Sequence, residues 1–445
     1  MIESVVKRSP ALSRFAGYLA IALILAGSLA GIEMQRGLGF SFSAIYDAGQ
    51  RVLAGATADL YNAAAPIGGE TPLGRTTYPG TPLASLLFTP LAQFEPRLAM
   101  TLYKLAGTLC LWTGLVLLYR HMRQFAGASP AERSHFFATF FGAALMFQPL
   151  WAVYAVGGSN MSFVFLLCVV GLIGHMRGRF AVSAACLTIA GLLLAPLLLA
   201  LLLPLALAGV RFRLIAGAMI AGFALLSVLL FGIDVHLSLV TRMVYEFRHL
   251  EMPYFSGNLF TWVEVMLLSR EDYFTLHDTP LTVAAFALAL RLAAVAGFAW
   301  LCLAFRRRAD PAAWRHAVFL LAIMAQPILS VSVSGERLAI LFLPLTLLLA
   351  GWRQLPPLAR AAVVCTLVMS LAQNPLVVTW VVDRFGMESW GNLFAVAVMK
   401  GLPMILTALT FAVWARPIAE VYERRVGFRQ IDMVPGKGPT KGKNA

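Results

Sequence analysis

Apolar runs long enough to cross a lipid bilayer recur from one end of this 445-residue sequence to the other. One helix needs about 17–25 predominantly apolar residues to span the hydrocarbon core. Charged residues make up 13% of the chain and hydrophobic residues 60%, whereas soluble domains contain about 25% charged residues. The sequence therefore predicts an all-α, polytopic membrane protein with about 12 transmembrane helices.

The predicted spans are unevenly spaced along the chain. We place them near residues 15–35, 98–119, 136–156, 161–175, 180–193, 197–209, 214–233, 281–305, 316–331, 336–351, 361–374 and 392–415. The first run has no small-residue cleavage site after it, so we interpret it as a retained span and not as a signal peptide. Residues 180–209 are too many for one span and few for two. We interpret them as a hairpin of two short helices that meet near Ala195–Pro196.

The net charge of +14 is distributed in a way that orients the chain. With these spans, 23 of the 35 Lys and Arg residues lie on the side of the two termini, and 8 lie on the opposite side. Cytoplasmic loops carry such an excess, so we expect both termini in the cytoplasm and the protein in the inner (plasma) membrane. This distribution of the positive charge argues against a nucleic-acid partner. We interpret residues 1–415 as one transmembrane domain and the basic tail 416–445 as a surface anchor.

Three long loops lie on the predicted outer side, at residues 36–97, 234–280 and 375–391. Long loops on one side indicate a site at that membrane face. An apolar stripe that includes Tyr46 predicts an amphipathic helix, which Gly55 ends. In the second loop, aromatic residues mixed with charges are typical of a segment at the headgroup level. We therefore expect amphipathic helices in these loops.

Soluble-enzyme and metal-binding motifs are absent from the sequence. It contains no Walker A loop, HExxH, GxSxG or Rossmann fingerprint. The seven histidines are scattered without metal-ligand spacing, so no metal site is predicted. The five cysteines lie far apart in apolar runs, which is typical of core residues.

Ionisable residues inside the predicted spans are candidates for a site, because a charge in hydrocarbon costs a few kcal/mol unless it is paired or hydrated. Lys104 and Lys400 are also compatible with snorkelling or with a helix–helix hydrogen bond. Arg291 lies too deep to snorkel easily, which leaves a paired or a site-lining role. Glu336 and Arg337 follow a polar break at the outer face, and we favour a site role for this pair.

Several short motifs resemble those of a known family. They are Tyr46–Gly55, Leu60–Tyr61, Tyr78–Leu83, Thr89–Leu91, Gly158–Asn160, Leu194–Pro196 and Gly257–Asn258. Over roughly residues 40–210 the chain resembles glycosyltransferase family 87, a mannosyltransferase-like group of the GT-C superfamily of polyprenyl-phosphate-dependent glycosyltransferases. The resemblance implies a GT-C-like fold.

The sequence departs from the family pattern at the position of the acid. In the family, an acidic residue of the first outer loop, the presumed general base, precedes the tyrosine by several positions. Here Ser41–Ser43 occupy that register, and the nearest carboxylate is Asp47. We assign Asp47 as the candidate base. The alternative is that Asp47 is an ordinary helix residue on a solvated loop.

The resemblance implies a reaction and its participants. A hexose, with mannose as the candidate, would pass with inversion from a polyprenyl-phosphate donor to a lipid or envelope glycan acceptor at the outer face. The donor is a substrate, and no cofactor is expected. The partners would be membrane lipids, the polyprenyl-phosphate sugar and a glycan or glycolipid acceptor.

Two groups of residues would bind the donor. The phosphate candidates are Arg75, Arg291 and Arg337, with Lys104 behind them, because arginine binds phosphate through a bidentate fork. The candidates that line the sugar pocket, or merely cap turns, are Tyr78, Asn160 and Asn258.

Two other classes of function stay open. The missing acid favours a catalytically inactive lipid-binding or scaffold subunit. A lipid or glycan carrier would use the same cations, but it would favour internal repeats and polar residues along several helices. The sequence has no repeat, and its intramembrane charges are few and biased to one side.

Overall fold

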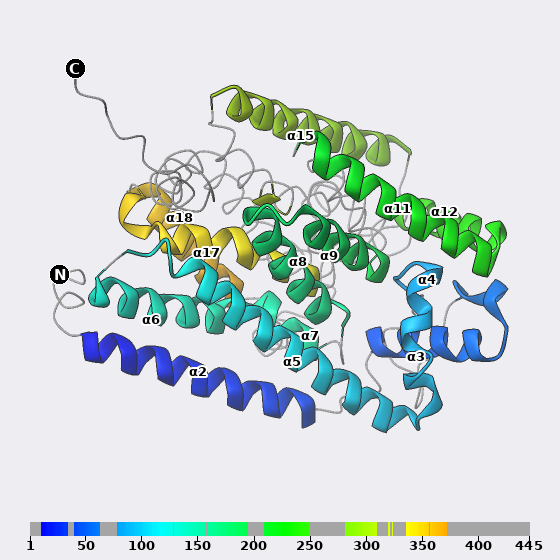
Figure 1. Cartoon of the computed structure of the whole chain (residues 1–445), viewed down its shortest axis with the longest axis horizontal. Coiled ribbons are helices and arrows are strands. Elements are labelled where there is room, and N and C mark those ends of the chain that lie inside the picture. Colours follow the sequence, from blue (N-terminus) through cyan, green and yellow to red (C-terminus); the bar gives the residue numbers. More distant parts are fainter. Residues whose placement is uncertain are drawn as a thin grey trace, which may run out of the picture.

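The computed structural model describes the greater part of the chain. The described residues are 10–33, 40–62, 78–127, 129–155, 159–194, 209–248, 281–308, 319, 320, 323, 335–355 and 357–371. All regular secondary structure in these ranges is helical (Figure 1), and the all-α prediction is confirmed. The third outer loop, the basic tail and the predicted spans 197–209 and 392–415 lie outside the described residues.

The helices fall into three groups. The longer ones are α2 (Pro10–Glu33), α5 (Pro96–Met122), α6 (Pro130–Met146), α8 (Met161–Met176), α9 (Phe180–Leu193), α11 (Val210–Phe231), α12 (Ile233–Arg248) and α15 (Leu281–Arg308). The others are α3 (Phe40–Leu53), α4 (Pro82–Ser85), α7 (Ala152–Ala155), α17 (Phe342–Ala350) and α18 (Pro357–Leu371). Short 3₁₀ helices are η1 (Thr57–Asp59), η2 (Leu86–Phe88), η3 (Leu91–Gln93), η4 (Gln148–Leu150), η5 (Gly335–Leu341) and η6 (Trp352–Gln354).

Three of the described helices, α2, α5 and α11, are long and apolar enough to cross a membrane. The pair formed by α6 and the segment Gln148–Tyr154 would be a fourth span, although its axis bends by 68°. The sequence predicts one span near 136–156. The bend follows from Pro149, because proline lacks the N–H that a continuous helix needs. The number of about 12 spans stays a prediction.

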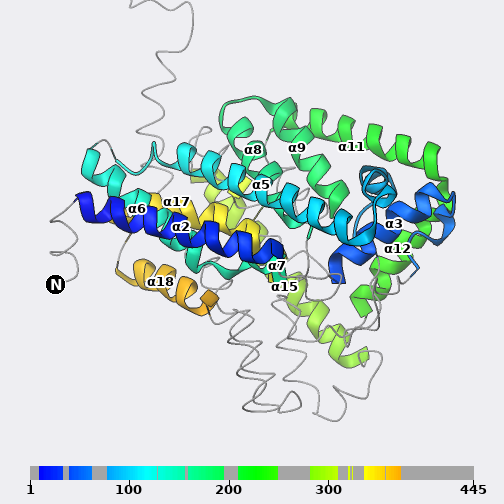
Figure 2. The ribbon, with the colours of Figure 1, turned by 90° about the horizontal axis from the view of Figure 1, so that it is seen from below.

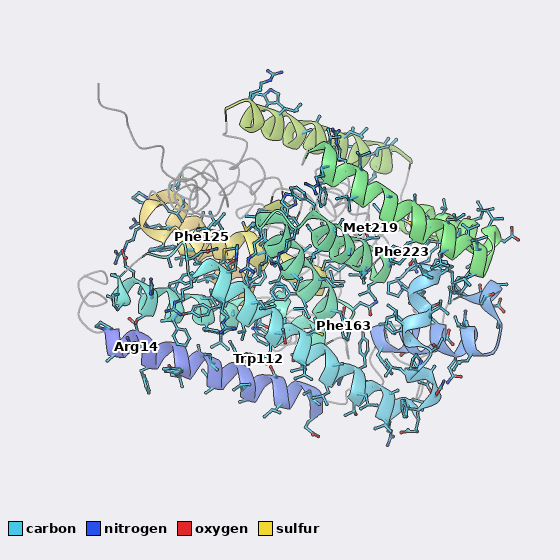
Figure 3. All side chains as sticks on the ribbon, in the orientation of Figure 1. Arg14, Trp112, Phe125, Phe163, Met219 and Phe223 are labelled. Atoms are coloured by element: carbon cyan, nitrogen blue, oxygen red, sulfur yellow. The ribbon has the colours of Figure 1, made fainter. Side chains whose placement is uncertain are left out.

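Helices α2 and α6 lie side by side and run in the same direction (Figures 1 and 2). The rings of Phe137 and Tyr154 occupy the space where Gly17 and Gly31 of α2 would carry a Cβ, so these glycines allow the close packing. Helix α5 joins the pair through Trp112, whose Nε1 lies 3.3 Å from the hydroxyl of Ser28 and donates to it (Figure 3).

Helices α9 and α11 also run in the same direction. Phe212, in the first turn of α11, packs against Phe180, the first residue of α9, with ring centroids 6.2 Å apart. The first turns of α9 and α11 therefore lie on the same side of the molecule. The second short helix predicted at 197–209 lies outside the described residues, so the hairpin at 180–209 stays a prediction.

A glycine separates the apolar helix α11 from the more polar helix α12. Gly232 has φ +78°, in the left-handed region that favours glycine, and it turns the chain between the two helices. His236 fixes the turn, because its Nδ1 lies 2.7 Å from the carbonyl oxygen of Gly232 and its Nε2 lies 2.8 Å from the hydroxyl of Ser227. This turn carries α12 toward α3 and α4, at the end of the molecule opposite the first turn of α2 (Figures 1 and 2).

Candidate functional site

Helix α3 is the amphipathic helix expected in the first outer loop. It buries Phe42, Ile45, Tyr46 and Ala48. The ring of Phe42 packs on Tyr103 of α5 at a centroid distance of 5.4 Å. The hydroxyl of Tyr46 donates a 2.8 Å hydrogen bond to the carbonyl of Phe94. The helix ends before Gly55, as predicted, where φ is +70°.

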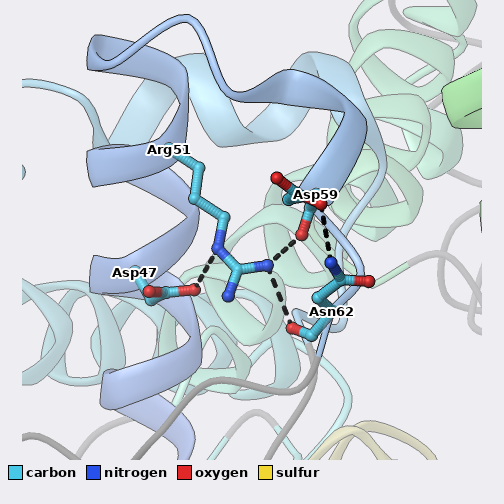
Figure 4. A network of polar contacts seen from close by, with 4 residues as sticks. All are labelled: Asp47, Arg51, Asp59 and Asn62. Carbon is cyan, nitrogen blue, oxygen red and sulfur yellow. Dashed lines mark hydrogen bonds and ion pairs between the residues drawn. The ribbon is translucent and has the colours of Figure 1, made fainter.

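A polar network covers the exposed side of α3 (Figure 4). Asp47 Oδ2 accepts from Nε of Arg51 at 2.7 Å, one helical turn away. The same guanidinium donates through Nη1 to the backbone carbonyls of Asp59 and Asn62, and the Asn62 amide donates to the Asp59 carboxylate at 2.7 Å. Arg51 thus clamps the segment that carries η1 onto α3.

Asp47 is the partly buried carboxylate of this network, whereas Asp59 is exposed. The Asp47 side chain is 32% exposed. Burial raises the pKa of the Asp47 carboxyl above its ordinary value, and the neighbouring Arg51 acts in the opposite direction. A carboxylate with a raised pKa is a stronger base than an ordinary aspartate.

Tyr61 and Tyr78 form an aromatic wall next to the network. Their ring centroids are 6.2 Å apart, and the hydroxyl of Tyr61 donates to the carbonyl of Gly80 at 2.9 Å. A side chain at Gly80 would overlap the Tyr78 hydroxyl. Burial raises the pKa of both phenols, so both stay protonated at neutral pH.

The Tyr78 hydroxyl is buried, and it has no hydrogen-bond partner among the described residues. A buried polar group without a partner costs about 1–3 kcal/mol. Such a group therefore indicates a ligand or a water molecule that supplies the missing bond.

Three segments converge on the carboxyl end of α9, where the last helical carbonyls lack partners within the helix. Both the backbone N–H and the hydroxyl of Thr81 donate to the carbonyl of Leu192, at 2.9 and 3.1 Å. The Asn160 amide donates to the carbonyl of Leu193 at 3.0 Å and accepts from the hydroxyl of Tyr103 at 2.6 Å. The motifs around Tyr78, Asn160 and Leu194 therefore meet in space.

Helix α12 adds an arginine to the aromatic wall. The guanidinium carbon of Arg242 lies 5.9 Å from the ring centroid of Tyr61, over its face, which is a cation–π distance. The sequence analysis missed Arg242. An apolar-polar pattern over Ile233–Arg248 could have indicated the helix, but it carries no information on which ring the arginine faces.

The predicted site residues are distributed over several parts of the chain. Tyr78 and Asn160 lie in the segments that meet at the carboxyl end of α9, and Asp47 lies on α3, paired with Arg51. Lys104, the residue after Tyr103 in α5, is buried. Arg337 lies in η5, which packs on η4, α7, α8 and α17, and the backbone of Glu336 is in the same turn. Arg75, Asn258 and the side chain of Arg291 lie outside the described residues.

Within the ranges that the structure describes, no three His, Cys, Asp or Glu side chains lie close enough together to bind a metal ion.

Apolar helices with a hydroxyl-rich aromatic cluster and a partly buried carboxylate at one end define a membrane protein with a site near the membrane surface. A match to a family model defines the protein more specifically than this description does. The sequence model of glycosyltransferase family 87 matches residues 77–327, more than half of the chain, and the protein belongs to this family. The resemblance noted in the sequence is thereby confirmed, and the protein is a GT-C membrane glycosyltransferase.

The crystal structure of ArnT from Cupriavidus metallidurans bound to undecaprenyl phosphate aligns with 93% of this chain and 78% of that chain, with 16% identity and a TM-score of 0.34. A search among curated proteins finds no match.

Proposed function

We propose that this protein transfers a hexose from a polyprenyl-phosphate donor to a hydroxyl of a lipid or envelope glycan, with inversion, at the outer face of the membrane. Mannose is the first donor sugar to test. The observation that carries the proposal is the buried Tyr78 hydroxyl, which lacks a partner among the described residues. The segment that follows Tyr78 packs through α4 and η2 on α3, the helix that carries the partly buried carboxylate of Asp47. A sugar hydroxyl is a suitable partner for this phenol.

Asp47 is the proposed general base. Its carboxylate takes the proton of the acceptor hydroxyl while the acceptor oxygen forms a bond to the anomeric carbon of the sugar. The bond between that carbon and the phosphate oxygen breaks, and polyprenyl phosphate leaves with the electron pair. Attack opposite the leaving group inverts the anomeric centre. The raised pKa of Asp47 supports this role.

Arg242 is the proposed ligand of the leaving phosphate. It approaches the site from α12, on the side of Tyr61, and a guanidinium offers two parallel donors to a phosphate. The leaving phosphate has further candidate ligands in Arg75, Arg291, Arg337 and Lys104.

Asn160 takes a positioning role in this proposal. Its amide nitrogen and its amide oxygen each already bind a protein group, so it holds α5, α8 and α9 together. Tyr78 then remains the proposed hydrogen-bonding partner of the sugar, with Asn258 as a second candidate.

The test uses the purified full-length protein in lipid nanodiscs with a panel of polyprenyl-phosphate hexoses and lipid-extract acceptors. We expect release of polyprenyl phosphate and a glycosylated product, whose anomeric configuration NMR should show to be inverted. Asp47→Asn serves as the inactive control. Binding of every donor without turnover would favour the inactive lipid-binding subunit, and movement of intact donor across a vesicle membrane would favour the carrier.

A further inference from the structure

A second polar site lies at the other end of the molecule, where α2, α5 and α6 meet. A cavity of about 330 Å³ is lined by Arg14, Tyr18, Tyr119, Arg123, Pro130, Arg133, Ser134 and Phe137. The volume lies within the range of small-molecule sites. Figures 1 and 3 show that Arg14, near the start of α2, lies far from α3 and α12, which carry the candidate transferase site.

The cavity gathers positive charge from three helices. Arg14, Arg123 and Arg133 line it. None of the three forms an ion pair with a carboxylate of the described residues. The nearest acid in sequence, Glu132, is already paired with Arg353 and caps the amino end of α6. The cavity is therefore suited to an anion.

Three hydroxyl groups complete the polar lining. Nε of Arg14 donates to the hydroxyl of Ser134 at 3.1 Å, which fixes the direction of the guanidinium. Tyr18 and Tyr119 contribute phenols to the same wall. This combination of guanidinium and hydroxyl groups is typical of phosphate sites.

The surface beside the cavity is apolar, which favours a lipid over a free anion. Three apolar side chains of α2 that are close to Arg14 in sequence are exposed: Leu12, Phe15 and Leu19. The ring of Tyr18 packs edge-on against Phe137, with centroids 5.2 Å apart. Acyl chains can lie along this face of α2 while the headgroup reaches the arginines.

We propose that the cavity binds the phosphate of an anionic phospholipid in the leaflet at this face. The positive-inside rule assigns this end to the cytoplasm, and basic pockets between helices on that side are suited to acidic headgroups. The site is separate from the donor site of the proposed transfer reaction, so it neither requires nor contradicts that reaction.

The test titrates the delipidated full-length protein with phosphatidylglycerol, with phosphatidylcholine and with inorganic phosphate, and bound lipid is counted by native mass spectrometry. We expect phosphatidylglycerol to be retained in preference to phosphatidylcholine. Arg123→Gln and Arg133→Gln should each weaken this binding by about fivefold, which corresponds to about 1 kcal/mol per basic residue at a membrane surface.

The matched control is Arg120→Gln, a substitution of an exposed arginine on the last turns of α5 that does not line the cavity. It should bind phosphatidylglycerol like the parent. Equal retention of phosphatidylcholine, displacement of the lipid by millimolar inorganic phosphate, or parent-like binding by the Arg123→Gln/Arg133→Gln double variant would each overturn the proposal. A shared unfolding temperature in detergent will show that the variants are folded.

Discussion

The Tyr103 hydroxyl donates a 2.6 Å hydrogen bond to Oδ1 of Asn160, across 57 positions of sequence. Because the same amide donates to Leu193, a single side chain connects α5, α8 and α9. Both Tyr103 and Asn160 are nearly inaccessible to solvent. A hydrogen bond between buried groups is costly to break, since each group then loses its partner without gaining water.

Removal of this bond should destabilise the protein. Tyr103→Phe leaves the Asn160 oxygen without its partner, and we expect a loss of about 1–3 kcal/mol of unfolding free energy. Asn160→Ala should cost more, because it strands both the phenol and the Leu193 carbonyl. Thermal unfolding in nanodiscs measures the effect. Thr101→Val, which removes a hydroxyl of α5 whose hydrogen bond to the Arg97 carbonyl is exposed, is the control. A Tyr103→Phe variant that unfolds with the parent would contradict the structural role of the bond.

Local signals in the sequence were sufficient to predict most of the helices. Helix α9 was predicted at 180–193 and is observed at Phe180–Leu193, and α15 was predicted at 281–305 and is observed at Leu281–Arg308. Gly55 ends α3 as predicted. These helix bounds depend on the length of an apolar run and on residues that end a helix. Both can be read from a short stretch of sequence.

The contacts that build the candidate site are not local, and the sequence could not give them. Hydropathy treats Arg242 and the other loop arginines alike, so nothing marked it as the one over Tyr61. The role of Asn160 depends on Tyr103 and on a carbonyl at Leu193, which belong to different helices. Motif likeness placed Tyr78 and Asn160 in one family pattern, but only the fold shows what each of them touches.

Arg242 should matter for donor binding. We expect Arg242→Gln to weaken binding of a polyprenyl-phosphate sugar by about 1.5–3 kcal/mol, the range for hydrogen bonds to charged groups. Arg242→Lys should recover part of this, because an ammonium keeps the charge but not the fork. Equilibrium binding of a fluorescent donor analogue measures the difference.

Arg337→Gln is the comparison variant for the Arg242 substitutions. Arg337 lies in η5, and η5 packs on different elements from those that pack on α3, the helix of the candidate site. A larger loss in Arg337→Gln than in Arg242→Gln would transfer the phosphate role to η5. Parent-like affinity in both variants would remove both arginines from the phosphate site.

The orientation of the chain can be measured by cysteine labelling. In a variant without the native cysteines, a cysteine at Asn62 should react with an impermeant maleimide from outside, because the first loop is predicted to face outward. Cysteines at Gln124 and Arg307 should react only after the membrane is permeabilised. Outside labelling at Arg307 would contradict the assignment of both termini to the cytoplasm.

Asp47 is the residue on which the proposed chemistry depends most. Asp47→Asn keeps the shape of the side chain and removes the base, so turnover should fall by about 10²–10⁴ while the donor still binds. Asp59→Asn is the matched control, since Asp59 belongs to the same network but is exposed. Equal turnover in Asp47→Asn and the parent would exclude Asp47 as the base.

The pH dependence of turnover separates a base from a merely structural carboxylate. A general base acts in its deprotonated form, so kcat/KM should fall as the pH drops through the pKa of Asp47. Since burial raises this pKa, the acid limb should lie at a higher pH than an ordinary aspartate would give. Arg51 lowers the pKa. Removal of its charge in Arg51→Gln should therefore move the acid limb to still higher pH, whereas Arg51→Lys, which keeps the charge, should move it less. An acid limb that stays in place in Arg51→Gln, or that persists in the residual activity of Asp47→Asn, belongs to another group and contradicts the assignment.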